Sequence, residues 1–290
     1  MATILDGKAI AARVRAEVAG RATAFRERYG RPVGLVAVRV GDDPASEIYV
    51  RGKKKAALEA GMHAEEHHLE ASASEAELLA RVRTLNERDD VDAILVQLPL
   101  PRPLDPEPVI NLVRPDKDVD GLHPVNAGFL ATGRKGSRPC TPVGCLKLLD
   151  EAGVKLEGAH AVVVGRSNLV GKPVALMLLE RNCTVTLAHS RTRDLAGLVA
   201  QADVLIAAVG RPRLISGEWV KPGAAVIDVG MNRLEGKKLV GDVHFESAQE
   251  RAGVITPVPG GVGPMTIAML LSNAVDLAER RATGATRQAG

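Results

Sequence analysis

Aromatic residues are scarce in this chain of 290 residues: they make up 2% of it, so the core must be aliphatic. The formal net charge of +3 is small for this length, which argues against a basic surface for nucleic acid or an acidic membrane. No apolar run approaches the ~20 residues of a membrane span, and the first residues lack the apolar stretch of a signal peptide. We therefore expect a globular cytoplasmic protein with no nucleic-acid or membrane partner.

Cysteine is also rare, and the three cysteines lack C-x-x-C spacing: Cys140, Cys145 and Cys183. Such a sparse, odd set favours reduced thiols over a disulfide framework. The chain is long enough to bury a conventional core without disulfide or metal crosslinks.

Short apolar, β-branched runs alternate with helical patterns, which is typical of βαβ units. The expected strands are 35–40, 93–96, 161–164, 184–187, 204–209 and 225–229. Helices are expected at 46–60, 75–86, 172–181 and 194–202. Because several strands are apolar on both faces, the sequence predicts a doubly wound α/β protein with open, mostly parallel sheets and flanking helices.

The polar stretch from Thr132 to Pro139 is the best candidate domain boundary. After it the chain restarts with a helix from about Val143 and a fresh βαβ series, so the second domain is expected to be Rossmann-like. A last helix is expected at about 265–279, and from its own residues it could pack on either domain. The residues after Arg280 read as a frayed tail.

The segment from Val162 to Pro173 combines a strand, a glycine-bearing turn and a helix start. Backbone N–H groups at a helix N-terminus favour an anion such as a pyrophosphate. The spacing is not G-x-G-x-x-G, so a plain tight turn remains the alternative. The next strand ends in His189-Ser190-Arg191-Thr192-Arg193 instead of the acidic residue typical of NAD sites. With Arg166, this cluster favours a 2′-phosphate and hence NADP, the alternative being a solvated basic loop.

The helix expected near residues 44–60 carries Tyr49, Lys53, Ala56 and Ala60 on one narrow face. A lysine on such a face can act in proton transfer, although a lysine extending along the helix surface is the commoner case. Gln97 follows the strand 93–96, at the edge where open α/β sheets place their sites, and its amide could bind the lysine or a substrate. A structural cap is the alternative for Gln97.

Two motifs resemble metal sites. Asp116-x-Asp118-x-Asp120-Gly121 reads like the start of an EF-hand loop, but Ala127 stands where the bidentate Glu belongs. His63-Ala64-Glu65-Glu66-His67 matches H-x-x-E-H, but it follows Gly61 in a short connector or strand and lacks an obvious third ligand. We expect no metal.

Together, five blocks resemble the bifunctional methylenetetrahydrofolate dehydrogenase/methenyltetrahydrofolate cyclohydrolase family of one-carbon metabolism. The blocks occur in the family's order: Ala45-Ser46-x-x-Tyr49-Val50-x-x-Lys53, Val96-Gln97-Leu98-Pro99-Leu100, Lys117-Asp118-Val119-Asp120-Gly121, Gly165-Arg166-Ser167 and Pro259-Gly260-Gly261-Val262-Gly263-Pro264-Met265-Thr266-Ile267.

The resemblance implies that Lys53 serves the cyclohydrolase step, with Tyr49, Gln97 and Asp120 around it. The residues that it implies for substrate binding are Tyr49, Val50, Lys53, Val96, Gln97, Leu98, Asp120, Pro259, Gly260, Gly261, Val262 and Gly263. Those that it implies for NADP are Gly165, Arg166, Ser167, Ser190, Arg191 and Met231. The resemblance also implies that the last helix packs on the first domain. The folate-binding domain would then comprise residues 1–139 and 264–290, and the NADP domain residues 140–263.

The expected function is NADP-dependent oxidation of 5,10-methylenetetrahydrofolate to 5,10-methenyltetrahydrofolate, followed by hydrolysis to 10-formyltetrahydrofolate. The resemblance further implies a homodimer through the nucleotide domain. Three alternatives stay open: a dehydrogenase lacking the hydrolase step, a non-catalytic NADP-sensing module, and a zinc hydrolase centred on His63 and His67.

Overall fold

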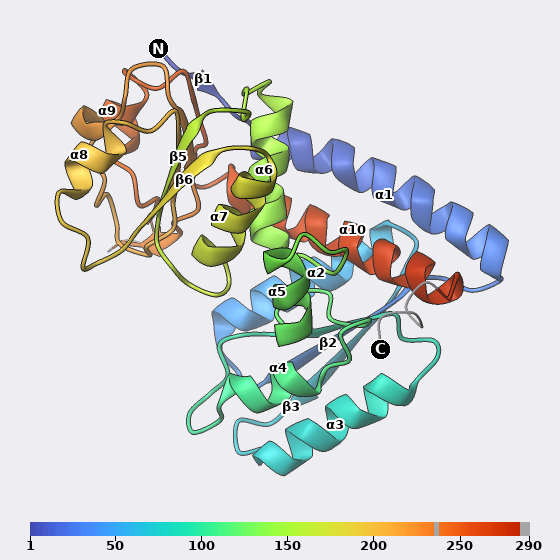
Figure 1. Cartoon of the computed structure of the whole chain (residues 1–290). Helices are drawn as coiled ribbons and strands as arrows, with labels where there is room; N and C mark the ends of the chain where they lie inside the picture. The colour runs from blue at the N-terminus through green and yellow to red at the C-terminus, as the bar shows by residue number, and fades with distance from the viewer. Residues whose placement is uncertain (235–237, 285–290) are drawn as a thin grey trace. The chain divides into compact units, whose positions relative to one another are not determined.

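The computed structural model describes residues 1–234 and 238–284. The chain forms two compact units (Figure 1). Unit 1 consists of Met1–Ala12 and Pro139–Met269, and unit 2 of Arg13–Arg138 and Leu270–Gly290. Two long helices, α1 (Gly7–Tyr29) and α10 (Val262–Ala282), each contribute residues to both units. Within the described ranges, no helix combines the length and apolarity that crossing a membrane requires.

Unit 1 is built on a six-stranded parallel sheet with strand order β1-β11-β8-β7-β5-β6. Its strands are β1 (Thr3–Ile4), β5 (His160–Val164), β6 (Thr184–Ala188), β7 (Val204–Ala207), β8 (Ala225–Asp228) and β11 (Val254–Ile255). The chain runs outward from β5 in both directions, with β6 on one side and β7 on the other. This reversal of strand order marks a doubly wound sheet.

Helices cover the sheet of unit 1. The helices α6 (Cys140–Glu151) and α7 (Gly171–Glu180) pack together, and α7 contacts β5 and β6 (Figure 1). The remaining elements of unit 1 are α8 (Leu195–Val199), the 3₁₀ helix η1 (Gly217–Trp219), α9 (Phe245–Ala248) and the antiparallel pair β9 (Asn232–Arg233) and β10 (Leu239–Val240). The central strands are buried on both faces, which explains their continuous apolar sequences.

Unit 2 holds a three-stranded parallel sheet with order β3-β2-β4. Its strands and shorter helices are β2 (Gly34–Val40), α2 (Pro44–Glu59), β3 (His63–Leu69), α3 (Glu75–Glu87), β4 (Ala93–Val96), α4 (Pro106–Leu112) and α5 (Pro124–Ala131). Helices α3 and α4 pack together (Figure 1). Alternate valines of β2, among them Val36 and Val38, share a core with Leu78 and Val82 of α3.

The structure confirms the α/β class and the predicted parallel sheets, and it places most predicted strands and helices within two residues. The strand predicted at 204–209 was too long, because β7 ends at Ala207. The helix predicted at 194–202 was also too long, because α8 spans only Leu195–Val199. Helix α1 was missed, although Ile10, Val14 and Val18 recur at helical spacing and are buried. The polar segment His63–Leu69 is a strand that pairs with β2.

The compact units differ from the predicted domain limits at two places. Residues 1–12 were expected in the first, folate-binding domain, but they group with unit 1, because β1 pairs with β11. The second transition lies at Met269/Leu270 instead of residue 263. A tail was expected after Arg280, but helix α10 continues through Arg281 and Ala282; residues 285–290 of that tail lie outside the described residues.

Candidate functional site

Helix α2 carries the candidate lysine. The helix begins after Asp43, whose carboxylate accepts a hydrogen bond from the Ser46 N–H at 2.8 Å. Along the predicted face, the exposed fraction falls from 41% at Tyr49 to 4% at Ala60, so this face runs from the surface into the core. Lys53 lies between them and is half-buried, but so is Lys54, so burial alone does not distinguish the two lysines.

Lys53 is bound to Gln97, which follows β4. The Lys53 Nζ donates to the Gln97 Oε1 at 3.1 Å. The Gln97 Nε2 donates to the Leu98 carbonyl at 2.6 Å, and its backbone N–H donates to the Val38 carbonyl at 2.9 Å. Because the amide nitrogen is held by the backbone, the amide oxygen faces the lysine. Gln97 therefore orients the Lys53 ammonium at the carboxyl end of the sheet.

The loop that carries Asp120 is anchored by a buried lysine. Lys117 is 1% exposed, and its Nζ donates to the carbonyls of Leu85, Asn86 and Arg88 at 3.2, 2.7 and 2.6 Å. These carbonyls lie at the end of α3, where helices leave their last acceptors unsatisfied. Burial lowers the pKa of Lys117 to about 8, and the charge of Arg281 adds to this. The lysine thus joins the loop to α3.

The neighbouring Asp118 fixes the other side of the same loop. Its Oδ2 accepts from the His123 N–H at 2.8 Å and from the Asn126 Nδ2 at 2.9 Å. Asp118 also forms an isolated parallel bridge with Ile94 of β4. Burial raises the pKa of the Asp118 carboxyl group. Asp120 therefore follows a segment that is held against the sheet from two directions.

Asp120 and Val96 line one small cavity of about 20 Å³, so the second and third sequence blocks come together. The other substrate candidates of unit 2 differ in exposure. Val50 is fully buried in the core face of α2, whereas Leu98 is half-buried and packs against the apolar core.

The predicted cofactor turn follows β5, next to the reversal of strand order. Gly165 has φ of 124°, and a Cβ on it would lie 2.0 Å from the Ala208 carbonyl oxygen. A Cβ on Gly171 would lie 2.0 Å from the Gly165 carbonyl oxygen. The Ser167 Oγ accepts from the Val170 N–H at 3.1 Å. Two glycines therefore let α7 start directly against the turn, as dinucleotide sites require.

The basic cluster after β6 forms a compact turn. The His189 N–H donates to the Thr192 Oγ1 at 2.8 Å, and the Arg191 N–H donates to the His189 Nδ1 at 3.1 Å. Ser190 and Arg191 are exposed at the carboxyl end of β6, and Arg166 is exposed at the carboxyl end of β5. Exposed guanidinium and hydroxyl groups at this edge fit the phosphates of a dinucleotide, including a 2′-phosphate.

The glycine-rich block at residues 259–263 lies beside Met231, the cofactor candidate after β8. A Cβ on Gly263 would lie 3.2 Å from the Met231 Cε. Pro259 and Gly260 precede helix α10. Position 261 must be glycine, because a Cβ there would lie only 2.6 Å from the Pro257 carbonyl oxygen. Val262 and Gly263 belong to the first turn of α10, so the predicted loop is shorter than expected. Pro264, which follows Gly263, is compatible with the first turn of a helix.

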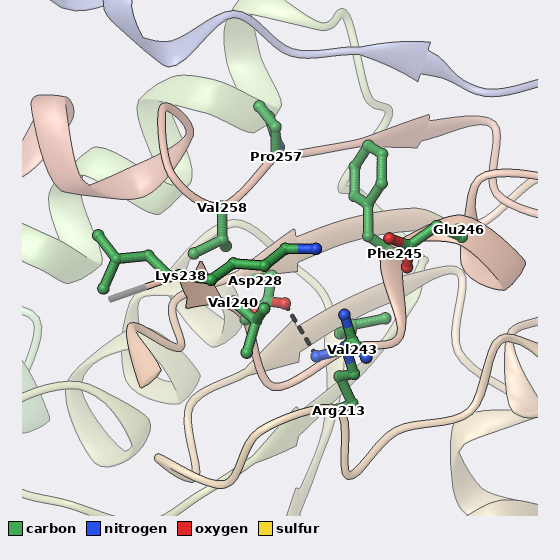
Figure 2. Close-up of a pocket in the computed structure, with 11 residues that line it drawn as sticks. Arg213, Asp228, Lys238, Val240, Val243, Phe245, Glu246, Pro257 and Val258 are labelled. Atoms are coloured by element: carbon green, nitrogen blue, oxygen red, sulfur yellow. Dashed lines mark hydrogen bonds between the residues drawn. The ribbon is translucent and has the colours of Figure 1, made fainter. Parts of the chain in front are cut away.

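A cavity of about 140 Å³ lies beside β10, which pairs antiparallel with β9. It is lined by Arg213, Asp228, Lys238, Leu239, Val240, Gly241, Val243, Phe245, Glu246, Pro257 and Val258. Figure 2 shows Asp228 at this cavity, with its carboxylate accepting from the Val243 N–H at 2.9 Å. Burial raises the pKa of Asp228 to about 7. Sequence reasoning missed Asp228, although its place at a strand's carboxyl end was a usable signal.

The histidine-rich strand β3 forms ion pairs within unit 2. Glu65 contacts the Nε2 atoms of His63 and His67 at 2.8 and 3.0 Å and accepts two hydrogen bonds from Arg88. Arg88 holds the pKa of Glu65 far below its usual range. Across residues 1–234 and 238–284, no group of three or more His, Cys, Asp or Glu side chains could hold a metal ion. The Asp116 carboxylate of the other motif is paired with Arg114 at 2.7 Å.

The three cysteines, Cys140, Cys145 and Cys183, are buried and carry reduced thiols. Burial raises the pKa of the Cys145 thiol to about 12, which keeps it protonated and unreactive.

The candidates fall into two groups. Lys53, Gln97 and Asp120 belong to unit 2, whereas the cofactor turn and the residues from Pro259 to Gly263 belong to unit 1.

Comparison with known proteins gives matches to both parts of the chain. Residues 5–120 match the family model "Tetrahydrofolate dehydrogenase/cyclohydrolase, catalytic domain", and residues 139–282 match "Tetrahydrofolate dehydrogenase/cyclohydrolase, NAD(P)-binding domain". "Bifunctional protein FolD 3" of Rhizorhabdus wittichii is 59% identical over 286 residues, covering 97% of this chain and 94% of the relative.

Two solved structures are similar over nearly the whole chain. The bifunctional FolD methylenetetrahydrofolate dehydrogenase/cyclohydrolase of Campylobacter jejuni has a TM-score of 0.95 and 46% identity, covering 97% of this chain and all of the other. The Trypanosoma brucei enzyme complexed with NADP and an inhibitor has a TM-score of 0.93 and 40% identity, covering 97% of this chain and 98% of the other.

Proposed function

Because the chain belongs to the tetrahydrofolate dehydrogenase/cyclohydrolase family, we propose that its unit 1 binds NADP and its unit 2 carries the hydrolytic lysine. The protein is an enzyme with two activities. It oxidises 5,10-methylenetetrahydrofolate to 5,10-methenyltetrahydrofolate with NADP, and it hydrolyses the methenyl compound to 10-formyltetrahydrofolate. The observation that carries this function is the presence of both family domains, in order, on one chain.

The edge of the sheet in unit 1 supports NADP binding. Gly165 and Gly171 let the turn after β5 pack closely against the Ala208 carbonyl and let α7 begin directly behind it, and the N-terminus of such a helix favours a pyrophosphate. Arg166, Ser190 and Arg191 are exposed at the ends of β5 and β6, where they would bind the 2′-phosphate. NADP, when bound, accepts the hydride that leaves the methylene carbon of the folate.

The chain's own contribution to oxidation is the alignment of two rings. Asp120 would bind the polar edge of the pterin ring, and Tyr49, one turn before Lys53 on α2, would pack beside the folate. The residues from Pro259 to Gly263, which adjoin Met231, would approach the substrate and the nicotinamide. Alignment of this kind lowers the barrier to hydride transfer, because the entropy cost of bringing the two reacting groups together is already met on binding.

In the hydrolytic step, a water adds its oxygen to the methenyl carbon and loses one of its two protons. One carbon–nitrogen bond then breaks: the released nitrogen takes up the remaining hydroxyl proton, and the formyl group stays on the other nitrogen. We assign to the Lys53 Nζ the movement of the first proton, the one that the attacking water loses. Gln97 supports this role, because its amide oxygen is 3.1 Å from the Nζ and holds it in one direction.

We also propose that the enzyme is a cytoplasmic homodimer that associates through unit 1. Strand β6 is the last strand in the order of its sheet, and Leu187 within it is 38% exposed, which supports pairing of this edge with a second copy. The three reduced cysteines fit a reducing compartment. Light scattering of the purified enzyme would test the oligomeric state.

The decisive experiment assays purified wild-type protein with methylenetetrahydrofolate and NADP, and then with methenyltetrahydrofolate alone. Both activities should be present. Lys53→Met should lower hydrolysis by about 100-fold or more, since positioned acid–base groups contribute at least that much, and should leave NADP affinity unchanged. Lys55→Met is the matched control, because Lys55 lies on the same helix with its side chain 75% exposed.

The alternatives give different results. Unchanged hydrolysis in Lys53→Met would remove the role assigned to this lysine. Oxidation without hydrolysis in the wild type would indicate a dehydrogenase alone, and NADP binding without either reaction would indicate a sensing module. Copurified zinc would support the hydrolase centred on His63 and His67.

A further inference from the structure

A second buried carboxylate in unit 1, Asp242, ties together two loops at the carboxyl edge of the sheet. It lies just after β10 and is 0% exposed. Its Oδ2 accepts from the N–H groups of Val209 and Gly210 at 2.6 and 3.0 Å. Its Oδ1 accepts from the Arg211 N–H and the Asn232 Nδ2, both at 2.9 Å.

These four donors use the full accepting capacity of an ionised carboxylate, which has about four lone-pair sites. Three of them belong to the loop that follows β7, and the fourth belongs to Asn232, directly after Met231. An asparagine at position 242 would keep one accepting oxygen and place an NH₂ group against N–H donors. The geometry therefore specifies an aspartate.

Asp228, the last residue of β8, holds Asp242 itself. The Asp228 Oδ1 accepts from the N–H groups of Gly230 and Asp242, both at 2.9 Å. Its Oδ2 accepts from the Val243 N–H, the bond drawn in Figure 2. The two carboxylates thus form one connected network of backbone donors, and such networks fix a local conformation when every member is satisfied.

Glycines make this network possible. A Cβ on Gly241 would lie 1.8 Å from the Asp228 Oδ2, and a Cβ on Gly230 would lie 2.4 Å from the Asp242 Oδ1. Both glycines therefore give the carboxylates direct access to the backbone.

The position of these loops follows from strand order. In a doubly wound sheet, a dinucleotide lies across the reversal of strand order, with one half over each group of strands. The candidates for the 2′-phosphate follow β5 and β6, so the nicotinamide half falls to the loops after β7 and β8. Those are the two loops that Asp242 joins.

We propose that Asp242 is a positioning residue for the dehydrogenase reaction: it fixes the backbone around Val209, Gly210 and Met231 against which the nicotinamide ring is oriented. This inference rests on the proposed function, because it requires NADP to bind at this edge. Asp242 acts through the loops and touches neither substrate nor cofactor. It has no part in hydrolysis, for which Lys53 and Gln97 belong to unit 2.

The enzyme supplies its own internal control, since hydrolysis of methenyltetrahydrofolate uses no NADP. We expect Asp242→Asn to lower the dehydrogenase kcat by about 10- to 100-fold, the scale of loss when reacting groups are misplaced by about 1 Å. The KM for NADP should change less than kcat, because the 2′-phosphate contacts are untouched. Hydrolysis should stay within about 2-fold of wild type.

The matched control is Asp203→Asn. Asp203 also accepts a backbone hydrogen bond, from His160 at 2.9 Å, but it precedes β7 and so lies at the opposite edge of the same sheet. This variant should leave the ratio of the two activities unchanged. Asn232→Ala, which removes one donor and keeps the carboxylate, is the second variant and should lower the dehydrogenase kcat by a smaller factor with hydrolysis intact.

The outcomes distinguish a failure of this inference from a failure of the proposed function. A parallel fall of both activities in Asp242→Asn, with an unchanged ratio in Asn232→Ala, would show a purely structural role and overturn the inference. An unchanged dehydrogenase kcat in both variants would also overturn it. A wild-type enzyme without NADP-dependent oxidation would instead refute the proposed function on which the inference rests.

Discussion

Replacing Lys117 by methionine tests how a buried charge stabilises the loop that carries Asp120. Methionine keeps the length and apolar character of the side chain but cannot donate to the three carbonyls that the Nζ contacts. Hydrogen bonds from a charged donor contribute about 1.5–3 kcal/mol each. The cost of burying the Lys117 charge opposes these hydrogen bonds. The lowering of the Lys117 pKa from 10.5 to about 8 puts that cost at about 3 kcal/mol.

At pH 7 we expect the three lost hydrogen bonds to outweigh the relieved burial cost, so that Lys117→Met lowers the free energy of unfolding by about 3 kcal/mol. The pH dependence is the sharper test. Between the folded pKa of about 8 and the unfolded value of 10.5, the unfolded chain binds more protons at Lys117 than the folded chain does. Stability of the wild type therefore rises with pH in this window through Lys117, and the methionine variant lacks that rise.

The difference in unfolding free energy between wild type and Lys117→Met should accordingly grow by about 2 kcal/mol from pH 7 to about pH 9.5. Urea unfolding followed by far-UV circular dichroism at several pH values measures it. Lys135→Met, at an exposed lysine of the same unit, is the control and should show a constant difference from wild type. Parallel stability profiles for wild type and Lys117→Met would refute the reasoning.

Two further substitutions test local packing and capping. Gly171→Ala should weaken NADP binding by about 10-fold or more while methenyltetrahydrofolate hydrolysis persists, because the new Cβ would meet the Gly165 carbonyl oxygen and displace the start of α7. Gly20→Ala, where no atom lies within 4 Å of the new Cβ, is its control, and equal NADP affinity in both variants would contradict the argument. Ser74→Ala removes the capping box of α3 and should lower the unfolding free energy by about 1 kcal/mol in urea titrations, whereas an unchanged value would show that the cap contributes nothing.

The sequence predicted best those strands whose residues are buried on both faces. Runs such as 93–96 and 161–164 are apolar throughout and alternate with helical patterns, and these two local signals together identified them as parallel strands. The edge strand His63–Leu69 offers no such signal, because its polar side chains form ion pairs within unit 2. Short strands such as β1 and β11, of two residues each, are too brief for any pattern.

The candidate site also divides into residues with a local sequence signal and residues without one. Lys53 and Gln97 were singled out because the helical spacing and the end of a strand are local signals. The structure joins these two candidates, 44 positions apart, by a hydrogen bond. The networks around Lys117 and Asp242 were not found from the residues. Asp242 meets Val209 across 33 positions, and Lys117 meets Leu85 across 32 positions. Contacts of this kind depend on how the sheets and loops pack, which one sequence does not specify.

The pairing of β1 with β11 constrains when unit 1 can be completed. Thr3 pairs with Val254, so the strand of this sheet that is synthesised first bonds to the strand that is synthesised last. During synthesis the N-terminal segment must wait for some 250 residues before its partner exists, while the strands between them can already pair. We therefore expect β1 to join last. A chain shortened before Val254 should hold the central strands β5 to β8 with its N-terminus still accessible to proteases.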